Sequence, residues 1–514
     1  MTSTDLSLPQ PRGAVGSTLA ANRLGVSSIL GFNLTAAAPL TVAAGLITTG
    51  YAVGVTAIPA AFLVGAVVLV IFSVGYVAMA RHVANAGAFY AYVTRGLGRP
   101  AGVAAALVAL LAYNAMQVGL YGGVGAAAGP LLQQWFDLDL SWWLIALFAW
   151  AVTAVLGLLR VDVNGRVLAV LLVAEILVIC VYDASDLGHV ARAGGHISLS
   201  AFSPTNLAGA TGAGAALVLA ITGFVGFESA VVFAEESKDP RRTVPRATYL
   251  SLGIIAVLYA ASAWAPTLPI GQHHIVDVSR QQGPEVIFTL AHQYLGKTAA
   301  DVGHALFVTG VIAAMISYHN TIARYAFALG RERVLPPMFA RTSRLTEAPW
   351  VASLMQSLLG LGVIVVFAQA GWDPLTKLFF LGGTGGGFGI LLLLTATSAA
   401  VVAFFHRRPL PDENAWQRLI APLLSFVLLA GVVVLAVHNI GTLLGDPHSR
   451  LRWVLLAAYP TVAVIGTVAA LVIRYYRNDV YATIGMGADS LTGRGVVDQG
   501  GGHVHASTRP DLWD

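Results

Sequence analysis

Long apolar stretches recur along almost the whole chain, separated by short polar segments. A helix of roughly 20 mostly apolar residues spans the hydrocarbon core of a bilayer, where no backbone group can stay unpaired. Of the 514 residues, 57% are hydrophobic and only 11% are charged, against about 25% charged in a soluble chain. We therefore predict an all-α integral membrane protein with twelve transmembrane helices.

The predicted spans are Val26–Thr48, Val55–Ala80, Pro100–Gly125, Ser141–Leu159, Arg166–Val181, Gly214–Ala234, Thr248–Pro269, Val302–Leu329, Val351–Ala368, Leu375–Phe405, Ile420–His438 and Trp453–Tyr475. The shortest of them is Arg166–Val181. We expect a cytoplasmic N-terminal tail over residues 1–24 and a ten-helix transport core over 25–408. Helices 11 and 12 fall within 409–477, and 478–514 is expected to be a disordered cytoplasmic tail.

The positions of Lys and Arg predict the orientation, because basic residues are concentrated in cytoplasmic loops. If the N-terminus is cytoplasmic, only six of the 29 basic residues fall in outer loops, namely Arg192, Arg280, Lys297, Lys377, Arg450 and Arg452. Both termini are then cytoplasmic, in a multi-pass protein of the cell membrane. The pI near 9.2 could also suggest nucleic acid binding. We expect no nucleic acid partner, because the charges mostly flank apolar spans.

The sequence argues against a cofactor, a metal site and enzymatic activity. A single cysteine, Cys180, excludes a disulfide framework and a cysteine-based zinc site. The glycine run around Thr384 lacks the lysine of a phosphate-binding loop. A membrane-embedded enzyme would need clustered His or Asp motifs within the spans, and we find none.

The sixth span contains two glycines and a carboxyl at its middle. Gly223 and Gly226 each cost roughly 1 kcal/mol of helix propensity relative to alanine, and Glu228 follows them. Unwound backbone at this depth is tolerated only where it lines a cavity or meets a ligand. The pattern predicts a broken helix whose ends suit the carboxylate and the amine of a zwitterion.

The first span predicts a second break at the corresponding position of the first half. The segment LGFNLTAAAPLTVAAG contains Pro39, which removes a backbone donor and opens the helix. Spans 1 and 6 stand five apart, as an inverted five-plus-five repeat requires. Glycine and proline are also common in membrane helices, but paired breaks at matching positions favour a binding site.

The segment GFVGFESAVVFAEESKDPRRTVPRA resembles the sixth-helix signature of the amino acid–polyamine–organocation (APC) superfamily of permeases. The segments NAGAFYAYVTRGLGRPAG and IARYAFALGRERVLPPMFA are also similar to this superfamily. The resemblance covers spans 1 to 10. It implies an inverted repeat of the leucine-transporter type with broken helices 1 and 6, and substrate held between spans 1, 3, 6, 8 and 10.

The resemblance also implies which positions contact the substrate. The carboxylate would meet backbone near Ala36, Ala37 and Ala38, and the amine would meet carbonyls near Thr222, Phe224 and Val225. Thr41 and Gly226 belong to the same two breaks. The chain departs from the family in having three alanines where a Gly-Ser-Gly is usual, and Thr222 where an aromatic gate residue is common.

Other polar positions in the spans could also face the substrate. Tyr113, Gln117 and Tyr121 recur at every fourth residue, so they share one helix face that lines a pocket or bonds to neighbouring helices. Ser317, His319 and Asn320 cluster in span 8, and there a hydrogen-bonded structural histidine is favoured over a proton carrier. From these sets we include Tyr113, Gln117, Asn320 and Thr384 among the candidate substrate-binding residues.

Glu175 is a lone carboxyl among aliphatic residues of span 5, where a charge costs about 2.5–3.5 kcal/mol. Some members of the resembling family carry a lysine here, where sodium-coupled relatives hold an ion. We predict that Glu175 couples transport to a proton, with sodium less favoured, and that Glu228 assists. A permanently protonated structural acid is the alternative.

Together these features predict a secondary active permease for a small amino acid, working by alternating access and coupled to protons. The alternatives are a polyamine or amine carrier, or an amino acid exchanger, of the same fold. The charged segment EESKDPRR after span 6 is either a solvated loop or, with Arg331, Glu332 and Arg333, an inner-gate network.

Overall fold

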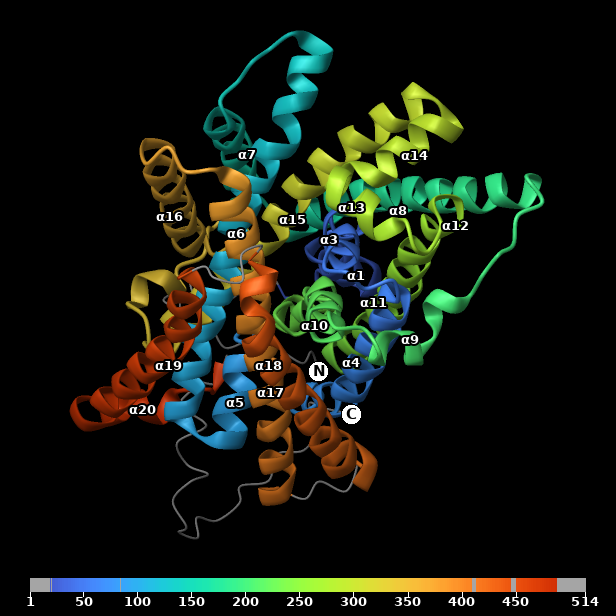
Figure 1. Ribbon diagram of the computed structural model, residues 1–514. Coiled ribbons are helices and arrows are strands. Elements are labelled where there is room, and N and C mark those ends of the chain that lie inside the picture. The colour runs from blue at the N-terminus through green and yellow to red at the C-terminus, as the bar shows by residue number, and fades with distance from the viewer. Residues whose placement is uncertain (1–18, 20, 84, 409–412, 445–449, 488–514) are drawn as a thin grey trace, which may run out of the picture.

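The computed structural model describes residues 19, 21–83, 85–408, 413–444 and 450–487 (Figure 1). Within these residues the regular structure is helical, apart from an isolated parallel bridge between Leu24 and Ser237. Eleven described helices are long and apolar enough to cross a membrane. The predicted span Ser141–Leu159 corresponds to a shorter apolar helix, α7 (Trp142–Gly157).

Two of the membrane-length helices are interrupted, and both interruptions lie near mid-helix. The first is divided into α1 (Val26–Ala36), α2 (Pro39–Thr41), the π-helical η1 (Val42–Leu46) and α3 (Ile47–Ala52). The second is divided into α10 (Ala213–Gly223) and the 3₁₀ turns η3 (Phe227–Val231) and η4 (Ala234–Glu236).

The other long helices are α4 (Ile58–Ala80), α6 (Arg99–Phe136), α8 (Val161–Arg192), α11 (Pro240–Trp264), α15 (Lys297–Arg331), α16 (Trp350–Gln369), α17 (Leu381–Arg407), α18 (Ala421–Leu443) and α19 (Leu451–Tyr476). The π-helical turns η7 (Leu375–Phe380) and η8 (Trp416–Ile420) lead into α17 and α18. Shorter helices connect them: α5 (Phe89–Leu97), η2 (Ser200–Phe202), α9 (Pro204–Ala208), α12 (Thr267–Ile270), α13 (Ile275–Gln282), η5 (Gly283–Glu285), α14 (Val286–Leu295), η6 (Pro337–Ala340) and α20 (Asn478–Thr483).

Two predicted boundaries differ from the structure. Helix α8 replaces the short span Arg166–Val181 and continues to Arg192, because Asp183 is not left unpaired: Ser262 donates a hydrogen bond to its Oδ2 at 2.8 Å. The tail predicted to be disordered from residue 478 begins with α20, and residues 478–487 pack on the bundle. Its remainder, 488–514, lies outside the described residues, as does nearly all of the predicted N-terminal tail before residue 21.

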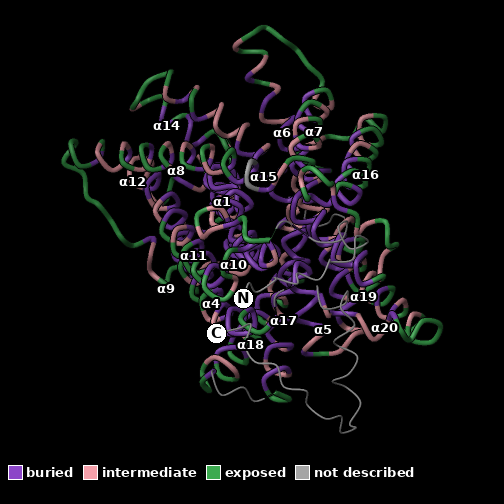
Figure 2. Tube along the Cα trace, turned by 180° about the vertical axis from the view of Figure 1, so that it is seen from behind, coloured by how far each residue is buried: buried purple, intermediate pink, exposed green. Residues whose placement is uncertain are grey.

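The interrupted helices lie in the centre of the bundle. Helix α1 packs against α8, α11 and α15, and α10 packs against α4 and α18. Figure 2 shows α1 and α10 mainly in the colour of buried residues, whereas α8 and α16 alternate between buried, intermediate and exposed residues. Many exposed positions of the peripheral helices are apolar, for example Val170 and Val464, which suits contact with lipid.

One side of the bundle, here called the terminal side, gathers residues 21–25, 85–95, 234–239, 331–335 and 478–487. Two buried bidentate ion pairs lie there. Glu236 accepts hydrogen bonds from Nε and Nη2 of Arg324 at 2.5 and 3.0 Å. Glu235 accepts bonds from Nη1 and Nη2 of Arg331 at 2.7 and 2.6 Å.

These pairs clarify the role of the charged segment after span 6. Glu235 and Glu236 are not solvated; they tie η4 to α15. Burial raises the pKa of Glu235, but the hydrogen bonds and charge of Arg331 lower it more, so the pKa lies below its ordinary value. The carboxylate therefore stays ionised at neutral pH. The stability that its pair with Arg331 contributes is lost only when acidification protonates Glu235.

Replacing Arg324 with Met should destabilise the protein by about 3–5 kcal/mol, because Glu236 would be left buried without its cation. The matched control is Arg242→Met, since the Arg242 side chain is 78% exposed and should change stability by less than about 0.5 kcal/mol. The measurement is the midpoint of thermal unfolding in detergent. Equal midpoints for the two variants would contradict the importance of the buried pair.

Candidate functional site

The first interruption turns the chain sharply between α1 and α2. Ala38 has φ +48°, a left-handed conformation that costs an alanine roughly 1–2 kcal/mol. Pro39, next in the chain, cannot donate a backbone hydrogen bond. The N–H of Leu40 instead donates to Oε2 of Glu175 on α8 at 3.4 Å. A side chain from another helix thus completes the interrupted backbone.

The second interruption turns at Gly226, between α10 and η3. Gly226 has φ +120°, which favours glycine. Its N–H donates to Oε2 of Glu228 at 2.8 Å. The other carboxyl oxygen of Glu228 accepts a bond from the hydroxyl of Tyr113 at 3.0 Å. Glu228 therefore satisfies the unwound backbone and is itself fully engaged.

The two interruptions are in direct contact. A Cβ atom built on Gly226 would lie 2.8 Å from both Cβ of Ala36 and the backbone nitrogen of Ala37, so only glycine fits. Asn33 joins the two segments: its Nδ2 donates to the carbonyl of Phe227 at 3.0 Å, and its Oδ1 accepts from Ser229 at 3.0 Å. The breaks predicted separately from the sequence form one site.

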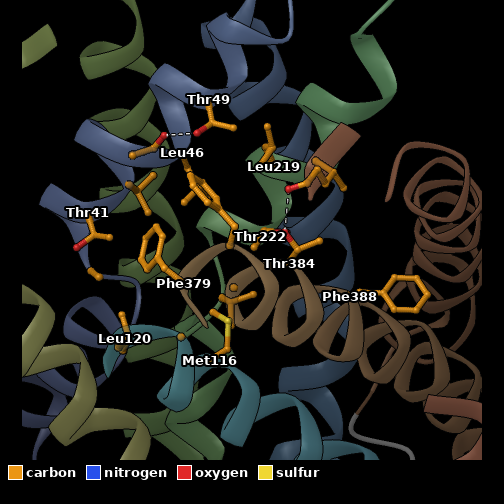
Figure 3. A pocket seen from close by; sticks show the side chains of 18 of the residues that line it. Thr41, Leu46, Thr49, Met116, Leu120, Leu219, Thr222, Phe379, Thr384 and Phe388 are labelled. Carbon is orange, nitrogen blue, oxygen red and sulfur yellow. Dashed lines mark hydrogen bonds between the residues drawn. The ribbon is translucent and has the colours of Figure 1, made fainter. Parts of the chain in front are cut away.

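A cavity with a volume of about 110 Å³ adjoins this contact. One water needs about 10–15 Å³ on the same measure, so the space suits a molecule of amino acid size. Figure 3 shows labelled side chains of the first interrupted helix, α6 and α10 gathered with Phe379 of η7 and Thr384 of α17, whereas Phe388 of α17 lies apart from this group. Its lining residues are Ala36, Ala37, Ala38, Thr41, Val42, Gly45, Leu46, Thr49, Met116, Gly119, Leu120, Val218, Leu219, Thr222, Val225, Ala314, Tyr318, Phe379, Phe380, Gly383, Thr384, Phe388, Ala436, Ile440 and Leu443.

The cavity lies in the half of the bundle away from the terminal side. Glu413, shortly before α18, pairs with Arg81 at 3.3 Å, so α18 begins on the terminal side and its far end carries Leu443. Helix α17 runs between Thr384, near its start, and Arg407, at its end. Arg407 Nη1 donates to the carbonyl of Gly96, next to the terminal side, at 2.8 Å, so Thr384 lies at the end of α17 that is far from the terminal side. The cavity therefore ends where the two interruptions meet.

The lining is apolar apart from hydroxyl groups. Among the described residues that form it, none carries a charge. Thr222 and Thr384 donate their hydroxyls to backbone carbonyls of Val218 and Leu443, at 2.8 and 3.2 Å. The buried hydroxyl of Thr41 has no hydrogen-bond partner among the described residues.

The twelve candidate substrate-binding residues divide into two groups. Seven line the cavity: Ala36, Ala37, Ala38, Thr41, Thr222, Val225 and Thr384. Five do not: Tyr113, Gln117, Phe224, Gly226 and Asn320. Whether any of the twelve binds substrate stays a prediction.

The five remaining candidates make contacts within the protein. Gln117 donates to Tyr121 at 3.2 Å, and Asn320 accepts a bond from Arg324 at 3.0 Å. Phe224 packs its ring against Tyr259. Tyr113 and Gly226 both bond to Glu228, as described above. These residues surround and support the interruptions.

Several lining residues escaped the sequence analysis. Tyr318 on α15 lines the cavity, whereas the neighbouring His319 points away and bonds to Ser353 of α16 at 2.8 Å. The face of α15 that meets the cavity could not be chosen from the polar cluster alone. Ala436 and Leu443 lie on α18, beyond the part of the chain that carries the family resemblance.

Glu175 is a residue of α8 and lies between the first interruption and α15. Its side chain is buried, with the residue 2% exposed. A Cβ atom on Gly310 of α15 would lie 2.6 Å from Oε1 of Glu175, so this glycine makes room for the carboxyl. Glu175 thus contacts α2 directly, two residues from Ala38 and one from Thr41 in the cavity.

Residues 21–466 match the sequence profile of the family described as amino acid permease. The low-affinity putrescine importer PlaP of Escherichia coli is 25% identical over 55% of this chain and 61% of its own length. The chain thus spans about three-fifths of that relative. The branched-chain amino acid permease BcaP of Bacillus subtilis is 26% identical over 74% of this chain and 79% of its own length. The lysine-specific permease LysP of Lactococcus lactis is 29% identical over 29% of this chain and 30% of its own.

A crystal structure of a manganese transporter from Eremococcus coleocola is similar in fold, with a TM-score of 0.55 and 12% identity. The similarity covers 90% of this chain and 99% of that one. The predicted architecture, an all-helical fold of the leucine-transporter type with two broken helices, is confirmed. At this identity the likeness concerns the fold alone.

Replacing Gly226 with Ala should push the two interruptions apart, because the added Cβ would meet Ala36 and Ala37 at a φ that alanine avoids. We expect substrate binding to fall at least about tenfold, with membrane insertion retained, because overpacking a close contact typically costs about 1–3 kcal/mol. The measurement is equilibrium binding of radiolabelled amino acid to the purified protein.

The control variant is Gly253→Ala on α11, where the added Cβ would have no described neighbour within 4 Å other than the adjoining backbone of its own helix. Unchanged binding by the Gly226 variant would remove the contact between the interruptions from the site.

Proposed function

The chain belongs to the amino acid permease family, and we propose that it is a secondary active transporter for a small neutral amino acid with an apolar side chain. The observation that carries this proposal is the cavity at the two helix interruptions, whose lining has hydroxyls and backbone but no charge. The amino acid backbone would bind at the interruptions, with its carboxylate near Ala37 and its amine near Thr222. Its side chain would then extend into the apolar part of the cavity.

A polyamine or a cationic amino acid fits the cavity less well. A dication needs carboxylates within a few ångströms to offset the loss of its hydration. Glu228 is engaged by Gly226 and Tyr113, and it does not line the cavity. The putrescine importer and the lysine permease among the relatives keep the amine carrier as the alternative. The branched-chain permease, which aligns over more of the chain, favours an apolar side chain.

Competition in proteoliposomes tests the substrate class. We expect leucine, valine or a similar apolar amino acid to inhibit uptake at concentrations at least about tenfold below those needed for lysine or putrescine, since burying an unpaired ammonium costs more than 1.4 kcal/mol. The measurement is inhibition of radiolabelled amino acid uptake by each compound. Stronger inhibition by putrescine than by any neutral amino acid would favour the amine carrier.

Proton coupling through Glu175 fits the position of this carboxyl. It bonds to the N–H of Leu40, so a change in its protonation alters the hydrogen bond that completes the first interruption. That interruption also forms the cavity wall at Ala38 and Thr41. Protonation and substrate binding would therefore act on the same backbone segment. A bound sodium ion or amino acid exchange are the competing ways to drive transport.

Glu175→Gln should abolish the response of uptake to an imposed pH gradient, because the amide cannot release a proton. Exchange of labelled for unlabelled amino acid across the same vesicles should persist. The control is Asp186→Asn, which removes another buried carboxyl near the far end of the same helix. If the Gln variant still accumulates substrate in response to the gradient, Glu175 is not the coupling group. If a sodium gradient alone drives the parent protein, proton coupling is wrong.

The charge distribution favours cytoplasmic termini in the cell membrane. The terminal side would then face the cytoplasm, and the cavity would lie toward the outside. The structure would correspond to a state that receives substrate from outside, closed on the cytoplasmic side by the ion pairs of Glu235 and Glu236. Transport would require these pairs to separate while the outer half closes.

A further inference from the structure

Residues 478–487 form a short segment that docks on the terminal side of the bundle. After α20, the chain passes through Gly485 (φ +82°) and Gly487 (φ +63°), left-handed conformations that favour glycine. A Cβ atom on Gly485 would lie 2.4 Å from Cγ2 of Thr94 on α5. The segment therefore fits closely against α5, and the two glycines are needed for the fit.

The backbone of this segment binds a buried carboxylate. Glu332 directly follows α15 and is completely buried. The N–H of Gly485 donates to its Oε2 at 2.5 Å, and the N–H of Gly487 donates to its Oε1 at 2.7 Å. Tyr90 and Asn85 donate to the same carboxylate. Converging backbone N–H groups of this kind form an anion-binding concavity.

Further contacts join the segment to the helices of the first half. Arg95 Nε donates to the carbonyl of Gly485 at 3.1 Å, and Arg99 Nη2 donates to the carbonyl of Ala482 at 2.9 Å. The guanidinium of Arg99 also lies over the ring of Tyr481 at 5.1 Å. Residues 478–487 thus connect α5 and α6 with the end of α15, which belongs to the other half of the core.

The same carboxylate adjoins the closed terminal side. Glu332 follows Arg331, which pairs with Glu235, and Oε1 of Glu235 also accepts a bond from the N–H of Ala86 at 3.0 Å. The loop at residues 85–86 is therefore held to Glu235 and to Glu332. A path on this side can open only if the loop separates from η4 or from the end of α15. Asn85 joins the loop to Glu332 at the end of α15, and residues 478–487 bind the same carboxylate.

We propose that residues 478–487 are an intramolecular latch, which holds the terminal side closed through Glu332 and is released when that side opens. Charge-assisted hydrogen bonds to a buried carboxylate are stronger than those between neutral groups, so the latch biases the closed state. Burial raises the pKa of Glu332, whereas the hydrogen bonds from Tyr90, Gly485 and Gly487 act to lower it, so residues 478–487 offset part of the cost of burying this carboxylate. The alternative is a cap that stays bound while the rest of the terminal side moves.

Two truncated chains, ending at residue 487 and at residue 477, separate the latch from the residues beyond it. Each carries Cys180→Ser and the reporter Ala86→Cys, whose position is buried in the closed state and keeps its backbone N–H. The measurement is the rate of labelling by a membrane-impermeant maleimide supplied from the terminal side. We expect the chain ending at 477 to react at least about fivefold faster than the full chain, and the chain ending at 487 to react at the full chain's rate.

Gly485→Ala in the full-length chain provides a second test that removes no residues. Its added Cβ would displace the segment from Thr94, so labelling should again accelerate, whereas Gly253→Ala on α11 should leave the rate unchanged. Both truncations reacting equally fast, or neither reacting faster than the full chain, would overturn the latch. The proposal rests on alternating access, but labelling needs no substrate, so its result is independent of the substrate class proposed above.

Discussion

The close contact between two unwound helix segments is the constraint on which the rest of the structure depends. Gly226 at φ +120° lies against Ala36 and Ala37, and each segment exposes backbone groups at the depth of a bilayer. Such groups must be satisfied by the protein, because lipid offers no hydrogen bonds. Asn33 and Glu228 supply partners for the second interruption, and Glu175 supplies one for the first. These contacts satisfy part of the unwound backbone from within the protein.

This arrangement gives the bundle two unequal halves. On one side of the interruptions lies an uncharged cavity, and on the other lie two buried bidentate ion pairs. A buried pair that loses its partner leaves an uncompensated charge, so the terminal side opens only if water or new partners replace these contacts. The transport proposed above requires such a change of access. Glu332, which accepts hydrogen bonds from the segment 478–487, adds a third buried carboxyl contact on this side.

The sequence allowed the helical fold and the positions of both interruptions to be predicted, because Pro39, Gly223 and Gly226 act through local backbone conformation. Hydrophobic runs likewise located the spans, although α8 proved longer than its apolar run. Which side chains of a span face the cavity was harder to predict from the sequence. Span 8 contained the polar cluster of Ser317, His319 and Asn320, yet Tyr318 is the residue of that stretch that lines the cavity.

Few contacts between distant segments could be predicted. The charged segment EESKDPRR was expected either as a solvated loop or as a network with Arg331, and Glu235 pairs with Arg331. Arg324 pairs with Glu236 across 88 positions of the chain, and no local pattern marks it among the other basic residues. Gly485 and Gly487 looked like part of a polar tail, because their function depends on Glu332, more than 150 positions earlier. Such pairings follow from the tertiary arrangement of the helices.

The most direct test of the site is protection of a thiol in the cavity by the transported amino acid. Thr222 lies at the end of α10, on the wall of the cavity, and Thr222→Cys in a Cys180→Ser background places one thiol there. A saturating apolar amino acid should slow alkylation of this thiol at least about fivefold by occupying the cavity. An alkylation rate that does not change at concentrations that saturate uptake would show that the substrate binds elsewhere.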